Sequence, residues 1–262
     1  MIWLLNRTHS EAAHQAAQDL HQFALSEGIE CRILEHASEP SADDMMIVLG
    51  GDGTLIQAAR RFAHLGLKMV AINLGRLGYI TSFSADQARF ALTAAASGAL
   101  VEDVRLRLSV RWAGHEAVAL NEALITSGQP GRICSLALTI DGQPATALRG
   151  DGALVATPTG STAYALSAGG PVLLPGLQAL VVVPVAPHSI RFRPLVLPPQ
   201  RVLSLRPEED AWLVLDGQER LRIQAGTEVT LDGTAPALRL LKERSHEHLV
   251  TLRDKLHWGE WS

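Results

Sequence analysis

The stretch that decides the fold is MMIVLGGDGT at residues 45–54, which continues as LIQAARRFAHLG at residues 55–66. A short apolar run ends in two glycines, an aspartate and a third glycine, and apolar residues then recur at helical spacing. The residues at that spacing are Leu55, Ala58, Ala59 and Phe62. The pattern predicts a buried strand, a tight turn and a helix with one packing face. Such a turn can bring backbone N–H groups and the positive end of a helix dipole to a phosphate.

The presence of Asp52 distinguishes this turn from a loop that only binds phosphate. The turn lacks the lysine of a GxxxxGK[ST] loop and the full spacing of a GxGxxG motif. A carboxylate beside a phosphate disfavours simple binding, but it can accept a proton from an attacking hydroxyl or help to hold a metal ion. The alternative is a tight turn without a ligand, since glycine is common wherever φ is positive. The predicted phosphate-binding residues are Gly50, Gly51, Gly53 and Thr54.

Residues 1–100 are predicted to form an α/β domain. The expected strands lie at residues 2–6, 29–35, 45–49 and 68–73. One expected helix begins with a capping box at Thr8 and Glu11 and ends near Glu27. A second helix, from Ala85 to Ser97, follows Ser84 and has Gln87 in the capping-box position. This alternation predicts a parallel sheet with helices on its faces.

Residues 101–235 are predicted to form a second, β-rich domain. In VRLRLSVRW, at residues 104–112, apolar residues alternate with three arginines and a serine, which predicts a half-buried strand whose arginines face solvent. Turn pairs with strand-like flanks are Gly114-His115, Asp141-Gly142, Asp216-Gly217 and Asp232-Gly233. One helical candidate, STAYALSAGG at residues 161–170, interrupts the strands. The segment 236–262 is expected to return to the first domain, as a helix or an extended chain.

Composition excludes several classes of protein. The chain has 262 residues, 47% of them hydrophobic, and a formal net charge of −4, so it can bury a core and has no overall field that attracts nucleic acid or anionic membrane. The two cysteines, Cys31 and Cys134, lie far apart and match neither a disulfide framework nor a zinc site. No stretch approaches the ~18 apolar residues of a membrane span, and a cytoplasmic location is expected.

A second glycine-rich stretch, GDGALVATPTGSTAYALSAGG at residues 150–170, carries several hydroxyls and a tyrosine ring that could contact a base. Asn121 and Glu122 stand near the end of a strand pattern. Taken alone, the stretch could be a solvated loop and the pair a solvated strand end.

In combination these segments resemble the NAD kinase family over nearly the whole chain. The matching stretches, in order, are GGDGT, NLGRLGYITSF, NEALI, GDGALVATPTGSTAYALSAGGPVL, PVAPHSIRFRPLVLP and TLRDKLHWG. The first motif is shared with diacylglycerol and sphingosine kinases, whereas residues 150–170 with the preceding Asn-Glu pair resemble NAD kinases in particular. The resemblance implies an α/β N-terminal domain with a parallel sheet and a β-rich C-terminal domain, the NAD kinase/diacylglycerol kinase-like fold.

The resemblance also implies an activity and a set of site residues. It implies transfer of the γ-phosphoryl group of ATP to the 2′-hydroxyl of the adenosine ribose of NAD, giving NADP, with Asp52 as proton acceptor. The positions that match the family's dinucleotide contacts are Gly53, Asn121, Glu122, Arg132, Arg149, Asp151, Thr162, Ala163, Tyr164, Ala165, Leu166, Ser167, Ala186 and Gln218.

The expected partners are therefore NAD and ATP, with Mg²⁺ or a similar divalent cation bound to the nucleotide phosphates and no metal site built from side chains alone. The resemblance further implies a homodimer or homotetramer, in which a neighbouring chain completes the dinucleotide site. Two alternatives stay open from the sequence: a lipid kinase of the same superfamily, and a dinucleotide sensor without catalysis.

Overall fold

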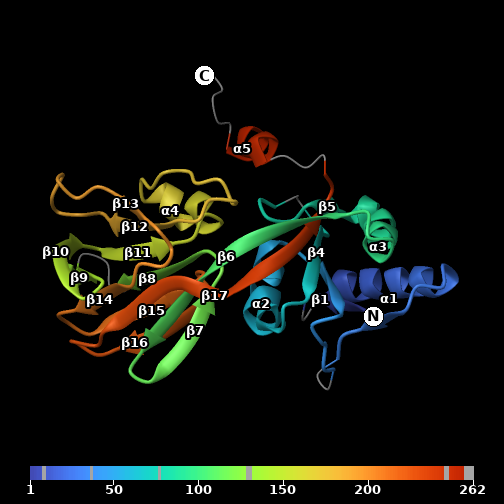
Figure 1. Ribbon diagram of the computed structural model, residues 1–262, viewed down its shortest axis with the longest axis horizontal. Helices are drawn as coiled ribbons and strands as arrows, with labels where there is room; N and C mark the ends of the chain where they lie inside the picture. Colours follow the sequence, from blue (N-terminus) through green and yellow to red (C-terminus); the bar gives the residue numbers. More distant parts are fainter. Residues whose placement is uncertain (8–9, 36–37, 76–77, 128–131, 245–247, 257–262) are drawn as a thin grey trace. The chain divides into compact units, whose positions relative to one another are not determined.

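The computed structural model describes residues 1–7, 10–35, 38–75, 78–127, 132–244 and 248–256. Two compact units divide the chain: unit 1 comprises Met1–Val104 and Ala237–Ser262, and unit 2 comprises Arg105–Pro236. Strands β6 (Val101–Trp112) and β17 (Val229–Lys242) each begin in one unit and end in the other (Figure 1). The sequence placed the divisions after residues 100 and 235, and the structure places them after residues 104 and 236.

Unit 1 is an α/β domain with a parallel sheet, as expected. Its strands follow the order β17-β4-β3-β1-β2, with β5 paired to β4, and the pairings are parallel. The strands that lie wholly in this unit are β1 (Ile2–Asn6), β2 (Cys31–Ile33), β3 (Met45–Leu49), β4 (Lys68–Asn73) and β5 (Phe83–Ser84). The helical segments are α1 (Glu11–Ser26), α2 (Asp52–Phe62), η1 (Ala63–Leu65), η2 (Ala85–Gln87), α3 (Ala88–Ala96) and α5 (His248–Leu256).

Apolar side chains on both faces of this sheet are covered by helices. Helices α1 and α3 share one core with alternate residues of β1, β3 and β4, and Figure 1 shows α2 on the other side of these strands. The predicted packing face of α2 is confirmed, because its four members are buried: Leu55, Ala58, Ala59 and Phe62. A strand covered on both faces reads as a continuous apolar run, which is why MMIVL is recognisable in the sequence.

One of the two predicted helix N-caps differs in the structure. Helix α1 begins at Glu11, and the Ser10 hydroxyl accepts a hydrogen bond from the Ala13 N–H at 3.3 Å, so Ser10 is the N-cap. Thr8, the predicted cap, lies outside the described residues. The capping box of Ser84 and Gln87 is confirmed, with the Ser84 N–H donating to Gln87 Oε1 at 3.0 Å.

Unit 2 is β-rich and contains two sheets. One has the strand order β13-β12-β11-β8-β15-β16, and the other includes β10-β9-β14-β17 together with β6 and β7. Strands of both sheets contribute to one buried core. The remaining bounds are β7 (His115–Ala119), β8 (Glu122–Thr126), β9 (Cys134–Ile140), β10 (Gln143–Gly150), β11 (Gly152–Ala156), η3 (Gly160–Thr162), α4 (Tyr164–Ser167), β12 (Leu180–Val185), β13 (Leu195–Leu197), β14 (Leu203–Pro207), β15 (Ala211–Leu215) and β16 (Glu219–Ile223).

Two of the four predicted turn pairs are confirmed. Asp141-Gly142 and Asp216-Gly217 have positive φ at both residues, as tight hairpin turns require. Between β6 and β7 the turn is instead Ala113-Gly114, one residue earlier than predicted. The prediction for Asp232-Gly233 is wrong, because these residues lie inside β17.

The prediction of a solvent-facing arginine row on β6 is also wrong. Arg105 and Arg107 are only 3% and 1% exposed. Arg105 Nη1 donates to the Thr159 hydroxyl at 3.3 Å, and Arg107 Nε donates to the Pro236 carbonyl. Burial lowers the pKa of Arg107 to about 10, and the neighbouring charge of Asp216 opposes that fall. The alternating pattern therefore predicted the strand correctly. It did not reveal that Arg105 and Arg107 are buried, because they pack against polar groups of distant segments.

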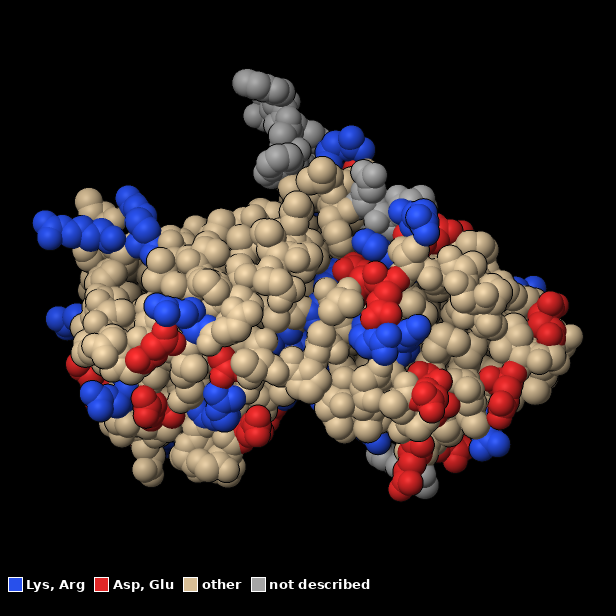
Figure 2. All heavy atoms as spheres, in the orientation of Figure 1, with Lys and Arg blue, Asp and Glu red and all other residues tan. Residues whose placement is uncertain are grey.

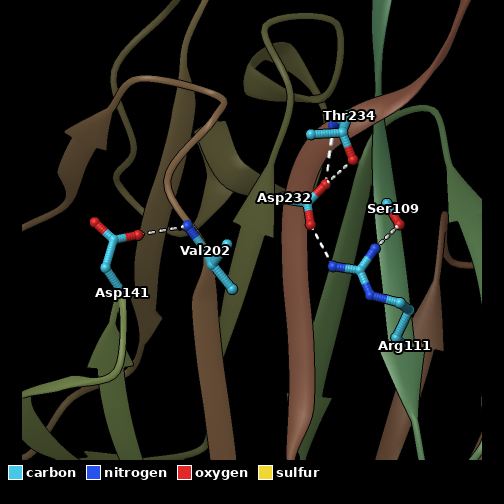
Figure 3. A network of polar contacts seen from close by, with 6 residues as sticks. All are labelled: Ser109, Arg111, Asp141, Val202, Asp232 and Thr234. Atoms are coloured by element: carbon cyan, nitrogen blue, oxygen red, sulfur yellow. Dashed lines mark hydrogen bonds and ion pairs between the residues drawn. The ribbon is translucent and has the colours of Figure 1, made fainter.

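Asp232 has a structural role at this part of β17. Figure 3 shows its carboxylate between Arg111 of β6 and Thr234, and the Arg111 guanidinium also donates to Ser109. Desolvation opposes ionisation of Asp232, but its hydrogen bonds with Thr234 and Arg111 outweigh that cost and lower its pKa. The aspartate that resembled a turn residue therefore ties β17 to β6.

Charged side chains of both signs are interspersed on the face shown in Figure 2. Among the described residues, no helix has the length and apolar character needed to cross a bilayer.

Candidate active site

The glycine turn joins the carboxyl end of β3 to the start of α2 in unit 1. Gly51 is the N-cap of α2 in an extended conformation, and its carbonyl accepts the Thr54 and Leu55 N–H groups. Gly53 is exposed in the first turn of the helix, where the positive end of the dipole lies. The Thr54 N–H is therefore already committed to the helix, whereas Gly53 lies where a phosphate is predicted to approach.

Gly50 departs from the prediction. Its N–H donates to the Ile72 carbonyl at 2.9 Å, so this amide is already committed to the sheet rather than to a ligand. A Cβ at Gly50 would collide with the Thr54 side chain. The glycine is therefore explained by close packing, and we correct its expected role as a phosphate donor.

The Asp52 carboxylate is held by backbone amides of another loop in the same unit. Oδ2 accepts the Tyr79 N–H at 2.7 Å, Oδ1 accepts the Thr81 N–H at 3.1 Å, and the Ile80 N–H lies 3.3 Å from both oxygens. A Cβ at Gly78 would collide with this carboxylate. The side chain is thus fixed in orientation while remaining partly exposed.

A second set of hydrogen bonds shapes the loop that receives Asp52. The buried Asn73, at the end of β4, donates through Nδ2 to the Thr81 hydroxyl at 3.2 Å and accepts the Gly75 N–H at 2.9 Å. The same hydroxyl accepts the Gly78 N–H at 3.1 Å. The motif NLGRLGYITSF thus contributes amide donors for Asp52 and side chains that position them.

A pocket of about 490 Å³ opens beside the glycine turn in unit 1. It lies at the carboxyl ends of β1 and β2 and follows α2 from Thr54 to Phe62. Its polar lining includes the side chains of Asn6, Arg7, Glu35, Gln57 and Arg61. Its volume lies within the ordinary range of small-molecule sites, and ligands commonly bind beyond the carboxyl ends of parallel strands. Sequence reasoning missed this pocket, since its members come from three separate segments.

The predicted Asn-Glu pair is buried in unit 2, not solvated. Asn121 and Glu122 are 8% and 5% exposed, and neither Asn121 Oδ1 nor Glu122 Oε2 has a hydrogen-bond partner among the described residues. Burial raises the pKa of Glu122 to about 7, and the nearby Asp216 carboxylate adds to the rise. Buried polar atoms normally have partners, so two such atoms on adjacent residues indicate a place for a polar ligand.

The hydroxyl-rich stretch packs directly against this pair. The Thr157 N–H donates to the Asn121 carbonyl at 2.9 Å, and the Thr157 hydroxyl donates to the Leu120 carbonyl at 2.6 Å. A Cβ at Gly160 would collide with the Asn121 backbone. The predicted helix is reduced to η3 and α4. Of the predicted contacts in this stretch, Tyr164 and Ser167 are exposed, Thr162, Ala163 and Leu166 are partly exposed, and Ala165 is buried in a core.

The other predicted contacts of unit 2 lie in three places. Arg149, Asp151 and Ala186 come together where β10, β11 and β12 meet, since the Asp151 N–H donates to the Val185 carbonyl at 3.0 Å and Gly150 packs on the Ala186 carbonyl. Gln218 follows the Asp216-Gly217 turn, close in sequence to the residue that contacts the Asn-Glu pair. Arg132 lines a separate pocket of about 160 Å³ with Asp210 and Trp212.

Comparison with known proteins decides the family. A model of the ATP-NAD kinase N-terminal domain matches residues 7–99, and one of the ATP-NAD kinase C-terminal domain matches residues 120–242. The NAD kinase of Thiobacillus denitrificans is 36% identical over 261 residues, which cover 97% of this chain and 89% of that protein. The chain belongs to the NAD kinase family. The NAD kinase of Aromatoleum aromaticum is a further member, 40% identical over 82% of this chain and 74% of its own length.

Two solved structures have the same fold as this chain. A crystal structure of an NAD kinase from Archaeoglobus fulgidus in complex with ATP superposes with a TM-score of 0.80 at 26% identity, covering 98% of each chain. Yeast NADH kinase complexed with NADH superposes with a TM-score of 0.86 at 19% identity, covering all of this chain and 88% of the other. The expected fold class is therefore confirmed.

Glu122→Gln tests the protonation of the buried pair through stability. The raised pKa means that the folded protein keeps a proton between pH 4.5 and about 7 that the unfolded chain has lost, so wild-type stability falls as pH rises through this range. The neutral glutamine lacks this dependence. Between pH 4.5 and 8, the unfolding free energy of the variant minus that of the wild type should rise by up to about 3 kcal/mol, measured by urea unfolding. Glu116→Gln, at an exposed glutamate of β7, is the control for loss of a carboxyl group, and pH curves of Glu122→Gln parallel to those of the wild type would contradict the assignment.

Proposed function

We propose that the protein transfers the γ-phosphoryl group of ATP to the 2′-hydroxyl of the adenosine ribose of NAD, giving NADP. The observation that carries the proposal is the fixed Asp52 carboxylate in the first turn of α2, in a chain of the NAD kinase family. A hydroxyl attacks phosphorus well only if its proton can leave, and this carboxylate stands where phosphate-binding amides are expected.

In the proposed reaction the 2′-oxygen of NAD bonds to the γ-phosphorus. The bond from that phosphorus to the β,γ-bridging oxygen breaks, ADP leaves, and the hydroxyl proton passes to an oxygen of Asp52. A carboxylate has about four acceptor sites, and three amide N–H groups occupy those of Asp52, with the Ile80 N–H shared between its two oxygens, so one site can still receive the proton. The amides keep the carboxylate in one orientation, which limits the reorganisation needed during transfer.

The buried pair in unit 2 supports binding of the adenosine part of NAD. Ribose hydroxyls and the adenine amine are hydrogen-bond donors, and Asn121 Oδ1 and Glu122 Oε2 are buried acceptors without a described partner. The exposed ring of Tyr164 offers a flat surface to a base. The predicted contacts at Arg132, Arg149, Asp151, Ala186 and Gln218 remain part of this proposal.

The pocket of unit 1 supports binding of the nucleoside part of ATP. It adjoins the glycine turn, and Arg7 and Arg61 can offset phosphate charge or stack on a base. No three histidine, cysteine, aspartate or glutamate side chains converge on a possible metal position in the described part of the chain. We propose that Mg²⁺ or a similar divalent cation enters with the phosphates of ATP and offsets their charge.

Incubation with ATP, Mg²⁺ and NAD tests the function directly. NADP should accumulate, measured with an NADP-specific dehydrogenase, and diacylglycerol in place of NAD should give no phosphorylated product. NAD binding without NADP formation would favour the dinucleotide sensor, and phosphorylation of the lipid would favour the lipid kinase.

Asp52→Asn tests the proton acceptor. We expect kcat to fall by roughly 10²–10⁴, the usual effect of losing a general base, while NAD affinity changes by less than about tenfold. The side-chain NH₂ group of asparagine would also face backbone N–H donors, so stability should fall by about 1–3 kcal/mol, and rates must be measured well below the melting temperature. Asp86→Asn, at an exposed aspartate in the first turn of another helical segment of unit 1, is the matched control. Retained turnover in Asp52→Asn would overturn its assignment as the base.

Arg61→Ala tests the donor pocket. Its guanidinium lies 4.7 Å from the Phe62 ring centre and lines the pocket. Loss of a charged contact to the donor should raise the KM for ATP roughly tenfold and leave the KM for NAD within about twofold. Arg89→Ala is the control, because Arg89 lies similarly over the Phe23 ring in the same unit but does not line the pocket. Equal changes in both KM values would contradict the placement.

We also propose a homodimer or homotetramer that completes the NAD site. Ile190, Leu195 and Val196 are exposed apolar residues on or beside β13, which ends the strand order of its sheet, and they support an interface there. Activity per mole should then fall on dilution, followed together with sedimentation velocity. A fully active 28.1 kDa species would overturn this proposal.

A cytoplasmic location remains part of the proposed function. The two cysteines, Cys31 and Cys134, are buried free thiols, which supports a reducing compartment. Cell fractionation with an NADP-forming assay checks it, and activity recovered outside the cytoplasm would contradict it.

A further inference from the structure

Asp216 contacts the Asn-Glu segment from a hairpin turn about ninety-five residues further along the chain. Its carboxylate accepts three consecutive backbone N–H groups: Oδ2 accepts that of Leu120 at 3.1 Å, and Oδ1 accepts those of Asn121 at 2.7 Å and Glu122 at 3.3 Å. In return the Asp216 N–H donates to the Glu122 carbonyl at 2.9 Å. These bonds fix the backbone direction at the point where β8 begins.

The turn itself does not require this buried carboxylate. Asp141 occupies the same position of another Asp-Gly hairpin turn, with φ of 50° against 51° for Asp216. The Asp141 carboxylate instead accepts the Val202 N–H at 2.9 Å, as Figure 3 shows, and pairs with the exposed Arg201. Asp216 is buried, whereas Asp141 is exposed. The burial of Asp216 therefore needs a reason beyond turn formation.

The position of Asp216 has an electrostatic cost. Its charge raises the pKa of the neighbouring Glu122 beyond the effect of burial alone. Buried Arg107, on β6, carries the opposite charge, and Asp216 opposes the burial-induced fall of the arginine pKa. The carboxyl groups of Asp216 and Glu122 can thus lie close together, because Asp216 is bonded to backbone amides and the Arg107 guanidinium compensates its charge.

We propose that Asp216 is a positioning residue for NAD: by accepting the N–H groups of residues 120–122 it holds the side chains of Asn121 and Glu122 where they can accept hydrogen bonds from the adenosine part. This inference rests on the proposed function. Because the Asp216 side chain accepts backbone N–H groups, it affects NAD binding by positioning the Asn-Glu pair and not by contacting the ligand. ATP binding in unit 1 does not depend on it.

The test measures NAD and ATP binding separately by isothermal titration of the full-length protein. Asp216→Ala should weaken NAD binding at least tenfold and change ATP binding by less than about twofold, and Asp216→Asn, which keeps one acceptor oxygen, should recover part of the NAD affinity. Asp141→Ala, at the matched turn, should bind NAD as the wild type does. Hydrogen exchange in the free protein should show faster exchange of the amides of residues 120–122 in Asp216→Ala only.

The outcomes separate this inference from the proposed function. Absence of NAD binding by the wild type would overturn both. NAD binding by the wild type that is unchanged in folded Asp216→Ala, or an equal loss of NAD and ATP affinity, would overturn the positioning role alone. If the alanine variant does not fold, Asp216→Asn decides, and wild-type NAD affinity together with wild-type exchange at residues 120–122 would overturn the role.

Discussion

The structure depends on one interaction used twice: an aspartate carboxylate that accepts consecutive backbone amides of a distant segment. Asp52 receives the amides of residues 79–81 in unit 1, and Asp216 receives those of residues 120–122 in unit 2. Hydrogen bonds to a charged acceptor are stronger than those between neutral groups, so each aspartate fixes a loop that would otherwise have several conformations. In each unit, one aspartate side chain from a distant part of the sequence holds the backbone of a site segment in place.

The two aspartates differ in exposure, and this difference assigns them different chemistry. Asp52 is partly exposed at a helix start, so a reacting group can reach it. Asp216 is buried beneath the residues that it holds and faces a buried guanidinium. In the proposed function, the same contact supports proton transfer in one unit and the placement of acceptors in the other.

The sequence predicted the elements whose pattern is local. MMIVL and IWLLN are apolar runs of strand length, and the helix after GGDGT has its four apolar residues on one face, all three as the structure has them. The family resemblance supplied the fold and the activity. What could not be predicted depends on contacts between distant segments: the burial of Arg105 and Arg107 requires polar chain on the second face of β6. Likewise, an Asp-Gly pair has the same local chemistry whether it forms a turn, as at Asp216, or lies inside a strand, as at Asp232.

The two crossing strands set the order in which the protein can fold during synthesis. Unit 2 is continuous, residues 105–236, whereas the sheet of unit 1 includes Arg239 and Leu240 of β17 paired with Lys68 and Met69 of β4. The Arg239 guanidinium also bonds Glu102 and the Gly66 carbonyl. A ribosome releases residues 1–104 first, yet their sheet lacks a strand until residue 240 has emerged. The half that is made first is therefore completed last, and a nascent chain must keep its apolar strands from aggregating until then.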